Sequence, residues 1–284
     1  MKKLHLSKCT IDWPKAYRNR AALDSDYSTL ITEPTTIYDE GELKIIYDIL
    51  PKDTISHLTQ AVRNIRYDPN WRTNGLGTLS RIFGYYSRNV IKNDFCHATS
   101  LAHDFPKEHN LICKFATDLA KLYEKYAPVQ FKEHRETTKA KILDNWTIDD
   151  TPFTSGIINK NNPLTYHQDR GNIPNMFSNM IGIVSNIRGG NLAIPEYDVG
   201  LKISNGSIVI FDGQKIVHGV TPIQRTSPNA YRYTLVYYTL LQMWQCLTPE
   251  KELERVKMVK TKRTESRLAR LKGEIPNKIK GNRN

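Results

Sequence analysis

The sequence predicts an α+β protein in which helices come first and a β barrel or jelly roll follows. Three features of the 284-residue chain support this prediction. Apolar residues recur at spacings of three and four in several segments before residue 150, which is typical of amphipathic helices. Short apolar runs separated by Gly, Asn and Pro dominate after residue 150. A strongly charged segment of helical composition closes the chain.

The amino-terminal part is expected to hold three helices. Residues 1–40 show no clear periodicity, so we expect an irregular arm there. Residues 42–49 and 54–65 carry apolar side chains at helical spacing, and residues 109–126 give the clearest helical pattern of the chain. Residues 71–84 are rich in Arg, Asn, Gly and Thr and are expected to form a surface loop.

Five segments of the second half are predicted strands. The last of them is rich in Tyr, Val, Leu and Thr, as expected of a buried strand. The regular spacing of turn residues between the segments is typical of a barrel or jelly roll. The predicted strands are residues 156–159, 180–184, 191–194, 207–211 and 231–240.

The charge of the chain points to a polyanionic partner. The net charge is +12, and residues 250–284 alone carry 12 Lys and Arg against 5 Glu. A basic surface gains affinity for nucleic acid by releasing counterions. Residues 251–272 have helical composition, so we expect a basic helical extension that contacts DNA; the alternative is a solvated extension without a partner.

The cysteines and the hydropathy bear on the compartment. Cys9, Cys96, Cys113 and Cys246 lie far apart without a CxxC pair, which argues against a zinc module and against a disulfide framework. We therefore expect free thiols and an intracellular, reducing environment. No apolar run approaches 18 residues and no signal-peptide pattern follows Met1, so we expect neither a membrane span nor secretion. We also expect a monomer.

His167 and Asp169 stand at positions i and i+2, where two side chains of a strand project to the same side. A second histidine, His218, follows 51 residues later, next to a predicted strand. Two His and one carboxylate form the facial triad of non-haem iron oxygenases, which leaves coordination positions for a co-substrate and dioxygen. The spacing alone leaves a chance match as the alternative.

Arg232 lies within the last predicted strand, where a charge is costly unless an anion pairs with it. Its planar guanidinium fits a carboxylate through two parallel hydrogen bonds. The distal carboxylate of 2-oxoglutarate would satisfy it, and Thr234 on the same side of the strand could donate its hydroxyl to that carboxylate. The alternative is a structural ion pair between Arg232 and an Asp.

Residues 156–172, 189–197, 211–222 and 232–234 resemble the TET/JBP group of 2-oxoglutarate oxygenases, and more narrowly its phage- and bacteria-borne members. Members of this group oxidise the 5-methyl group of pyrimidine bases in DNA. The resemblance implies a double-stranded β-helix of the jelly-roll, cupin-like type. It also implies Fe(II), held by His167, Asp169 and His218, and 2-oxoglutarate, held by Arg232 and Thr234, with O2 as the oxidant.

Further residues follow from the same resemblance. In TET proteins an Asn three residues after the metal-binding Asp reaches the flipped base, and Asn172 stands at that offset. Asn159 is a candidate contact to the co-substrate or the base. For both residues a purely structural role is the alternative. Arg72, Arg81 and Arg88 are candidates for phosphate contacts, against the alternative of a solvated basic face.

The resemblance divides the chain into three parts: an N-terminal arm with helices over residues 1–69, an oxygenase domain over 70–245 and a basic extension over 246–284. The cysteine-rich region of animal TET proteins has no counterpart here. The expected enzyme is an Fe(II)- and 2-oxoglutarate-dependent dioxygenase that hydroxylates 5-methylcytosine or thymine in DNA through a flipped nucleotide. The compartment would be the bacterial or host cytoplasm for a phage or bacterial protein, and the nucleus for a eukaryotic one.

Two other functions remain open from the sequence. The first is a 2-oxoglutarate-dependent hydroxylase of a protein or a small molecule, because one fold can serve many substrates. The second is a catalytically inactive barrel that binds nucleic acid.

Overall fold

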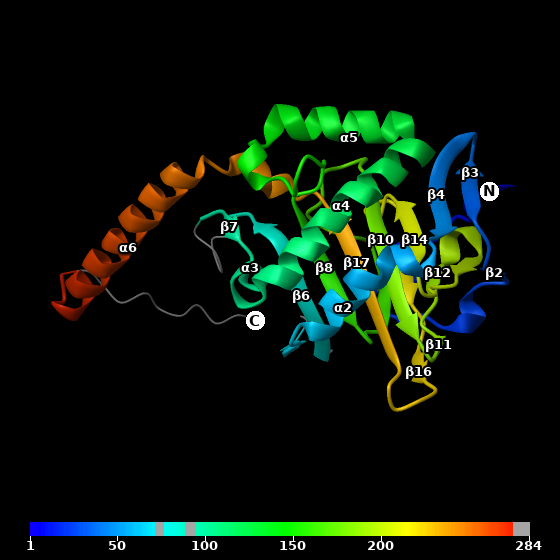
Figure 1. Cartoon of the computed structure of the whole chain (residues 1–284). Coiled ribbons are helices and arrows are strands. Elements are labelled where there is room, and N and C mark those ends of the chain that lie inside the picture. Colours follow the sequence, from blue (N-terminus) through cyan, green and yellow to red (C-terminus); the bar gives the residue numbers. More distant parts are fainter. Residues whose placement is uncertain (72–76, 89–94, 275–284) are drawn as a thin grey trace.

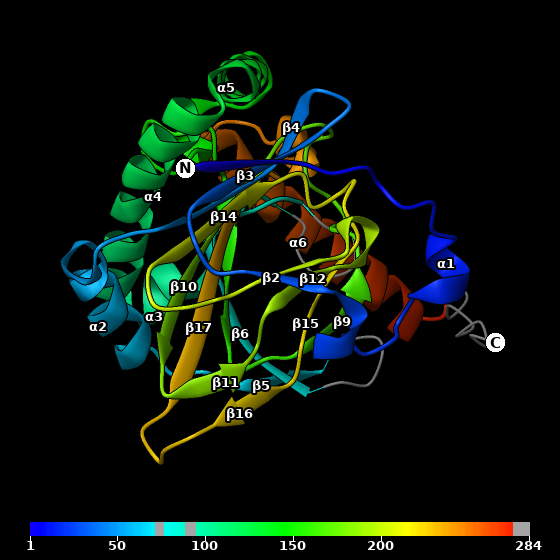
Figure 2. The same ribbon diagram turned by 90° about the vertical axis from the view of Figure 1, so that its right-hand side faces the viewer.

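Two β-sheets pack face to face in the computed structural model, which describes residues 1–71, 77–88 and 95–274. Figure 2 shows three layers, with helices on one face of the larger sheet and the smaller sheet on its other face. The prediction of an α+β protein with a jelly-roll core is confirmed.

The larger sheet has ten strands. Its central strands β14, β10, β17 and β8 all lie in segments that the sequence predicts to be strands. Its order is β1-β3-β4-β14-β10-β17-β8-β6-β5, with β7 paired to β6. The central pairs β10–β17 and β17–β8 are antiparallel. The strands are β1 (Lys2–His5), β3 (Thr35–Asp39), β4 (Glu42–Ile49), β5 (Pro69–Trp71), β6 (Gly77–Tyr86), β7 (His97–Ala98), β8 (Ser155–Lys160), β10 (Ser178–Ser185), β14 (Ser207–Phe211) and β17 (Tyr231–Tyr238).

The smaller sheet has five strands in the order β2-β13-β12-β15-β9, and a two-stranded ribbon pairs β11 with β16. One apolar cluster fills the space between the two sheets and includes Tyr47 and Phe211 of the larger sheet with Leu192 of the smaller one. The strands are β2 (Thr29–Ile31), β9 (Leu164–His167), β11 (Ile187–Gly189), β12 (Leu192–Ile194), β13 (Val199–Leu201), β15 (His218–Val220) and β16 (Ile223–Arg225).

Helices α2, α4 and α5 cover the other face of the larger sheet, whereas α6 extends away from the body (Figure 1). The predicted helices at 54–65, 109–126 and 251–272 are confirmed as α2, α4 and α6. The helices are α1 (Trp13–Ala16), α2 (Ser56–Asn64), α3 (Ser100–Asp104), α4 (Pro106–Tyr126), α5 (Pro128–Lys141) and α6 (Pro249–Leu271), and the 3-10 turns are η1 (Asp24–Asp26), η2 (Lys52–Ile55), η3 (Asp144–Trp146), η4 (Pro195–Tyr197) and η5 (Leu241–Gln245).

The helix predicted at residues 42–49 is wrong, because this segment is strand β4 between β3 and β14. Ile46 packs in the cluster beneath the helices, while Ile45 and Tyr47 pack in the cluster between the sheets. A strand buried on both faces loses the alternation of apolar and polar residues. Its apolar positions then imitate helical spacing.

The irregular arm predicted for residues 1–40 and the loop predicted for residues 71–84 are also wrong in part. The arm supplies β1 and β3 to the larger sheet and β2 to the smaller one, where β2 runs parallel to β13. Within the second segment, residues 77–84 belong to β6, which pairs with β8. Strands β1, β2 and β6 each pair with a strand that is distant in the sequence, so local periodicity does not reveal them.

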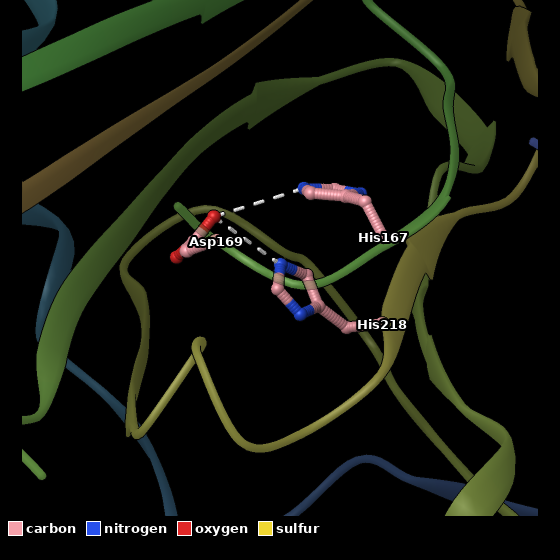
Figure 3. A group of neighbouring side chains, drawn as sticks. All are labelled: His167, Asp169 and His218. Atoms are coloured by element: carbon pink, nitrogen blue, oxygen red, sulfur yellow. Dashed lines mark ion pairs between the residues drawn. The ribbon is translucent and has the colours of Figure 1, made fainter. Parts of the chain in front are cut away.

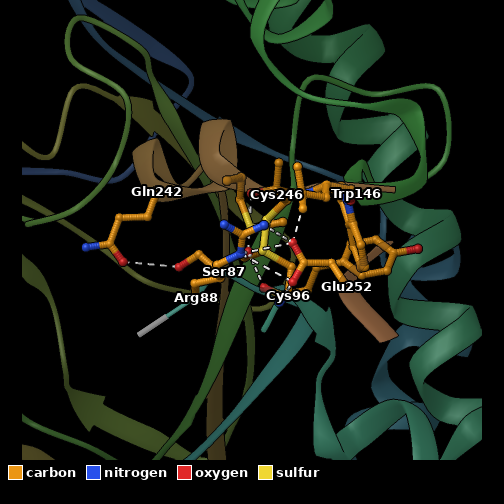
Figure 4. Close-up of a disulfide and its surroundings, with 12 residues drawn as sticks. Ser87, Arg88, Cys96, Trp146, Gln242, Cys246 and Glu252 are labelled. Atoms are coloured by element: carbon orange, nitrogen blue, oxygen red, sulfur yellow. Dashed lines mark hydrogen bonds and ion pairs between the residues drawn. A yellow bond between two sulfur atoms is a disulfide. The ribbon is translucent and has the colours of Figure 1, made fainter. Parts of the chain in front are cut away.

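The expectation that all four cysteines are free is wrong. Cys96 and Cys246 form a disulfide, with their Cα atoms 5.8 Å apart although the two residues are 150 positions apart in the sequence (Figure 4). Cys9 and Cys113 are free. Sequence spacing could not reveal a pair that only the folded chain brings together. Among the described helices, none combines the length and apolar character that crossing a bilayer requires.

Candidate active site

The three predicted metal ligands lie together between the ends of two paired strands. His167 ends β9 and His218 begins β15, and the two residues stand opposite each other in the antiparallel register. Asp169 follows β9 by two residues, and its Oδ1 lies 3.8 Å from Nε2 of His167 and 3.9 Å from Nε2 of His218 (Figure 3). One ligand atom from each residue lies within 4.8 Å of the other two.

Backbone hydrogen bonds orient both imidazoles. Nδ1 of His167 lies 2.8 Å from the Thr165 carbonyl oxygen, and Nδ1 of His218 lies 2.9 Å from the Ile216 carbonyl oxygen. A carbonyl only accepts, so Nδ1 of each ring carries the proton and donates. The Nε2 atoms, which the neutral tautomer leaves available as ligands, face Asp169. This tautomer is the one in which histidine binds a metal through Nε2.

A close backbone approach holds Asp169. Its N–H donates to the Gly213 carbonyl oxygen over 2.8 Å. A Cβ at position 213 would lie 2.3 Å from Oδ2 of Asp169, so only glycine fits there without displacing the carboxylate. Two imidazole nitrogens and one carboxylate on one side of an ion are the donor set of a non-haem Fe(II) site. The residues present therefore fit ferrous iron.

A cavity of about 710 Å³ opens beside these ligands, which is within the size range of small-molecule sites. Both sheets and the amino-terminal arm contribute to its wall. Its lining includes the three ligands and, among others, Arg18, Asn19, Asn159, Arg170, Asn172, Ser178, Met180, Phe211, Thr234 and Tyr238.

Arg232 is buried on β17 with 1% of its surface exposed. Its Nε donates to the Gly190 carbonyl oxygen over 3.1 Å, while Nη1 and Nη2 are buried without a hydrogen-bond partner. No carboxylate of the described residues pairs with it, which disfavours a structural ion pair. Burial lowers the pKa of Arg232 to about 10, so it remains charged at neutral pH.

An unpaired buried guanidinium fits the carboxylate of a bound co-substrate. Thr234 stands two residues from Arg232 on the same side of β17 and lines the cavity, whereas Arg232 itself is not part of the lining. A Cβ at Gly190 would lie 2.9 Å from Nε of Arg232, so the close approach requires glycine there. The donor groups of Arg232 and Thr234 have the chemistry that a carboxylate requires.

The two predicted asparagines both lie in the cavity wall. Asn159 on β8 stands opposite Thr234 in the register of β8 and β17 and accepts a 3.5 Å hydrogen bond from Asn162. Asn172 is buried, and its Nδ2 donates to Oγ of Ser178 over 3.2 Å. Their positions are compatible with contacts to a bound molecule.

The arginines predicted to contact phosphates behave differently. Arg81 pairs with Asp104, and Arg88 pairs with Glu252, whose side chain is buried. Both guanidinium groups are thus held by carboxylates of the protein itself. Arg72 lies outside the described residues.

The arm that walls the cavity was missed from the sequence. The Tyr17 ring packs edge-on against Tyr166 with ring centroids 5.0 Å apart, and the Arg20 carbonyl accepts from Tyr166 N–H over 2.9 Å. This attachment to β9 brings Arg18 and Asn19 to the cavity. No local pattern of residues 1–40 signals it, since both partners of each contact are polar or aromatic residues of unremarkable spacing.

Comparisons with known proteins show the family of the chain. The family model Tet_JBP, described as the oxygenase domain of the 2OGFeDO superfamily, matches residues 82–240. "Thymine dioxygenase JBP1" of Trypanosoma brucei brucei is 22% identical over 242 residues, which cover 82% of this chain and 28% of that protein. "Bifunctional helicase and thymine dioxygenase JBP2" of Leishmania major is 26% identical over 244 residues, covering 78% of this chain and 21% of that protein. The chain thus spans about a quarter of the length of these curated relatives.

A solved structure shares the fold. "NgTET1 in complex with 5mC DNA" superposes with a TM-score of 0.59 at 16% sequence identity, covering 87% of this chain and 93% of that chain. At this identity the likeness concerns the arrangement of the sheets and helices.

Proposed function

Because the chain belongs to the Tet_JBP family of oxygenase domains, we propose that it is an Fe(II)- and 2-oxoglutarate-dependent dioxygenase that hydroxylates the 5-methyl group of a pyrimidine in DNA. Two observations together carry the proposal. His167, Asp169 and His218 lie close enough to bind one metal ion. Arg232 on β17 carries a buried guanidinium whose Nη atoms have no partner. The first fits the metal and the second fits the co-substrate.

Each residue has a defined task in this proposal. The Nε2 atoms of His167 and His218 and the carboxylate of Asp169 hold Fe(II), which with 2-oxoglutarate and O2 supplies the oxidising chemistry when bound. Arg232 and Thr234 bind the distal carboxylate and orient the co-substrate. The cavity walls hold the target group close to the ligands and keep bulk water away.

A base must leave the duplex to reach this cavity, because the 5-methyl group otherwise lies in the major groove. Flipping a nucleotide costs a few kcal/mol of stacking and pairing, which contacts in the pocket must offset. We propose that Asn172 hydrogen-bonds the flipped base and that Asn159 contacts the base or the co-substrate. Thymine and 5-methylcytosine are both candidate targets, since they differ only at the group on C4 and its neighbouring ring nitrogen.

The test compares wild type with Asp169→Ala, supplied with Fe(II), 2-oxoglutarate and DNA that contains thymine or 5-methylcytosine. We expect wild type to form succinate and hydroxymethylated nucleosides, measured by mass spectrometry. Asp169→Ala should form neither, while Arg188→Gln on the exposed ribbon strand β11 should match wild type. Unchanged turnover in Asp169→Ala would refute the metal site. Succinate formation without any modified nucleoside would point instead to a protein or small-molecule substrate.

A further inference from the structure

Two arginines in the wall of the cavity are not used by the proposed chemistry. Arg18 and Arg170 both line it, and both are exposed to solvent. Within residues 1–71, 77–88 and 95–274, neither guanidinium makes an ion pair, a side-chain hydrogen bond or a ring contact. Asp169 is the only acidic residue of the lining, and it belongs to the metal site.

Three other exposed or half-buried arginines of the described chain are paired with carboxylates. Arg20, two residues from Arg18, forms an ion pair with Asp26. Arg81 and Arg88 are paired with carboxylates of the protein, as described above. Arg18 and Arg170 are thus free cations at the opening of a cavity, where a bound anion meets little competition from the protein.

The backbone that carries Arg170 is held on both sides. The N–H of Asp169 donates to Gly213, and the Gly171 carbonyl accepts from Leu241 N–H over 2.9 Å. Asn172 forms an isolated bridge with Leu240. The backbone of Arg170 is therefore fixed next to the metal ligand Asp169. An anion bound by Arg170 would lie close to the metal site.

The backbone that carries Arg18 is attached to the strand that carries the first metal ligand. Ala21 forms a bridge with Thr165 on β9, in addition to the contacts of Tyr17 and Arg20 with Tyr166. Figure 2 shows the segment with α1 beside β9. The backbones of Arg18 and Arg170 are therefore both attached to segments next to the metal ligands, and both side chains line the same cavity.

We propose that Arg18 and Arg170 form a phosphate-binding pair at the mouth of the cavity, which holds the DNA backbone next to the nucleotide whose base enters. This inference rests on the proposed function, because it takes DNA as the substrate. Guanidinium groups bind phosphate oxygens through parallel hydrogen bonds. Such contacts carry no base specificity, so the pair positions the strand while the cavity selects the base.

The test measures DNA affinity without turnover. A fluorescent duplex is titrated with wild type, Arg18→Gln/Arg170→Gln and Arg18→Lys/Arg170→Lys in the absence of iron and 2-oxoglutarate, at several salt concentrations. We expect the Gln variant to bind on the order of tenfold more weakly and its salt slope to fall by about 2, one for each lost phosphate contact. The Lys variant should keep most of the slope, because it keeps the charge.

Arg188→Gln is the matched control, since Arg188 is exposed and lies outside the cavity lining. It should bind like wild type. Wild-type affinity and slope in the Gln variant, with DNA still oxidised by the wild type, would overturn the phosphate-binding pair and leave the proposed function intact. A Gln variant that loses DNA affinity, while wild type modifies no nucleoside, would support the pair and refute DNA oxidation. Equal losses in the Gln and Lys variants would refute the role of charge.

Discussion

Buried charge and buried imidazole set the strongest constraints at the scale of single residues. Arg232 keeps a cation in the protein interior with two nitrogens unpartnered, and such a group costs several kcal/mol unless an anion compensates it. A buried arginine without a partner in the protein is typical of a site where binding of an anion has a function. On the proposed function, 2-oxoglutarate supplies this anion, so we expect the stability of the protein to depend on whether the co-substrate is bound.

Replacing Arg232 with Met should separate these two effects. Without co-substrate, the free energy of unfolding should stay the same or rise by on the order of 1 kcal/mol, because a buried unpaired charge is removed. Addition of 2-oxoglutarate should raise the melting temperature of wild type but not of the variant, since only wild type binds it. Calorimetry with and without 2-oxoglutarate measures both. A large loss of stability in the variant without ligand would mean that Arg232 stabilises the fold beyond its hydrogen bond to Gly190.

His134 on α5 is the second such residue. Its Nε2 lies 2.8 Å from Oγ1 of Thr239, while Nδ1 is buried without a partner. Burial lowers the pKa of His134 from 6.5 to about 3, so the ring is neutral in the folded protein. As the pH falls below about 6.5, His134 becomes protonated in the unfolded chain but stays neutral in the folded protein. Protonation therefore favours the unfolded state, and the protein has its full stability with respect to this residue only above that pH.

We therefore expect the free energy of unfolding to fall with decreasing pH between about 6.5 and 4, by up to about 1.4 kcal/mol per pH unit from this residue. His134→Gln should show a shallower pH dependence in urea unfolding. His57→Gln, at an exposed position of α2, should keep the wild-type dependence. Identical slopes in wild type and His134→Gln would contradict a neutral buried imidazole.

At the scale of elements, helix α6 is the part most remote from the sheets, and one residue anchors its base. The Glu252 carboxylate accepts from Nε of Arg88 over 3.0 Å and from the backbone N–H of Leu247 over 2.8 Å and of Cys96 over 3.2 Å (Figure 4). Burial raises the pKa of Glu252, but these hydrogen bonds outweigh it and leave the pKa below the usual value. The Cys96–Cys246 disulfide ties the same region together.

Glu252→Gln should therefore lower the free energy of unfolding by about 2 kcal/mol, because it leaves the half-buried Arg88 without its anion. Glu254→Gln, at an exposed position of the same helix, should change it by less than about 0.5 kcal/mol. Urea unfolding measures both variants. If adding Arg88→Met to Glu252→Gln recovers none of the loss, the ion pair is not its cause.

At the scale of the whole molecule, the amino-terminal arm is part of the sandwich. β4 pairs with β14 in the larger sheet, and β2 pairs with β13 in the smaller one. We propose residues 70–245 as the oxygenase domain, residues 1–69 as the arm and helices that complete it, and residues 246–284 as a basic extension. Because strands of residues 1–69 pair with strands of residues 70–245 in both sheets, we expect these two parts to fold as one unit.

A chain that begins at residue 70 should consequently fail to fold, because it exposes an edge of each sheet and uncovers the apolar cluster between them. A chain without residues 1–9 loses the edge strand β1 and the Lys8–Glu196 ion pair but keeps both sheets, so it should stay folded. Far-UV circular dichroism and size-exclusion chromatography distinguish the two, and we expect full-length protein to elute as a monomer. A folded, soluble fragment 70–284 would show that the arm is dispensable.

Local spacing along the chain was sufficient to predict several features of the fold and the site. The i, i+2 spacing of His167 and Asp169 predicted two side chains on one side of an extended segment, and the structure places them at the end of β9 and two residues beyond it. Helix α4 shows its buried face in residues three and four apart. Arg232 within an apolar strand indicated an anionic ligand, because a buried charge is costly without a partner. The tertiary structure decided whatever depends on contact between distant segments: β4 as a strand buried on both faces, the Cys96–Cys246 pair, and the arm that brings Arg18 to the cavity. Local periodicity does not predict such partners, because these contacts form and stabilise the protein only when distant segments come together in the folded chain.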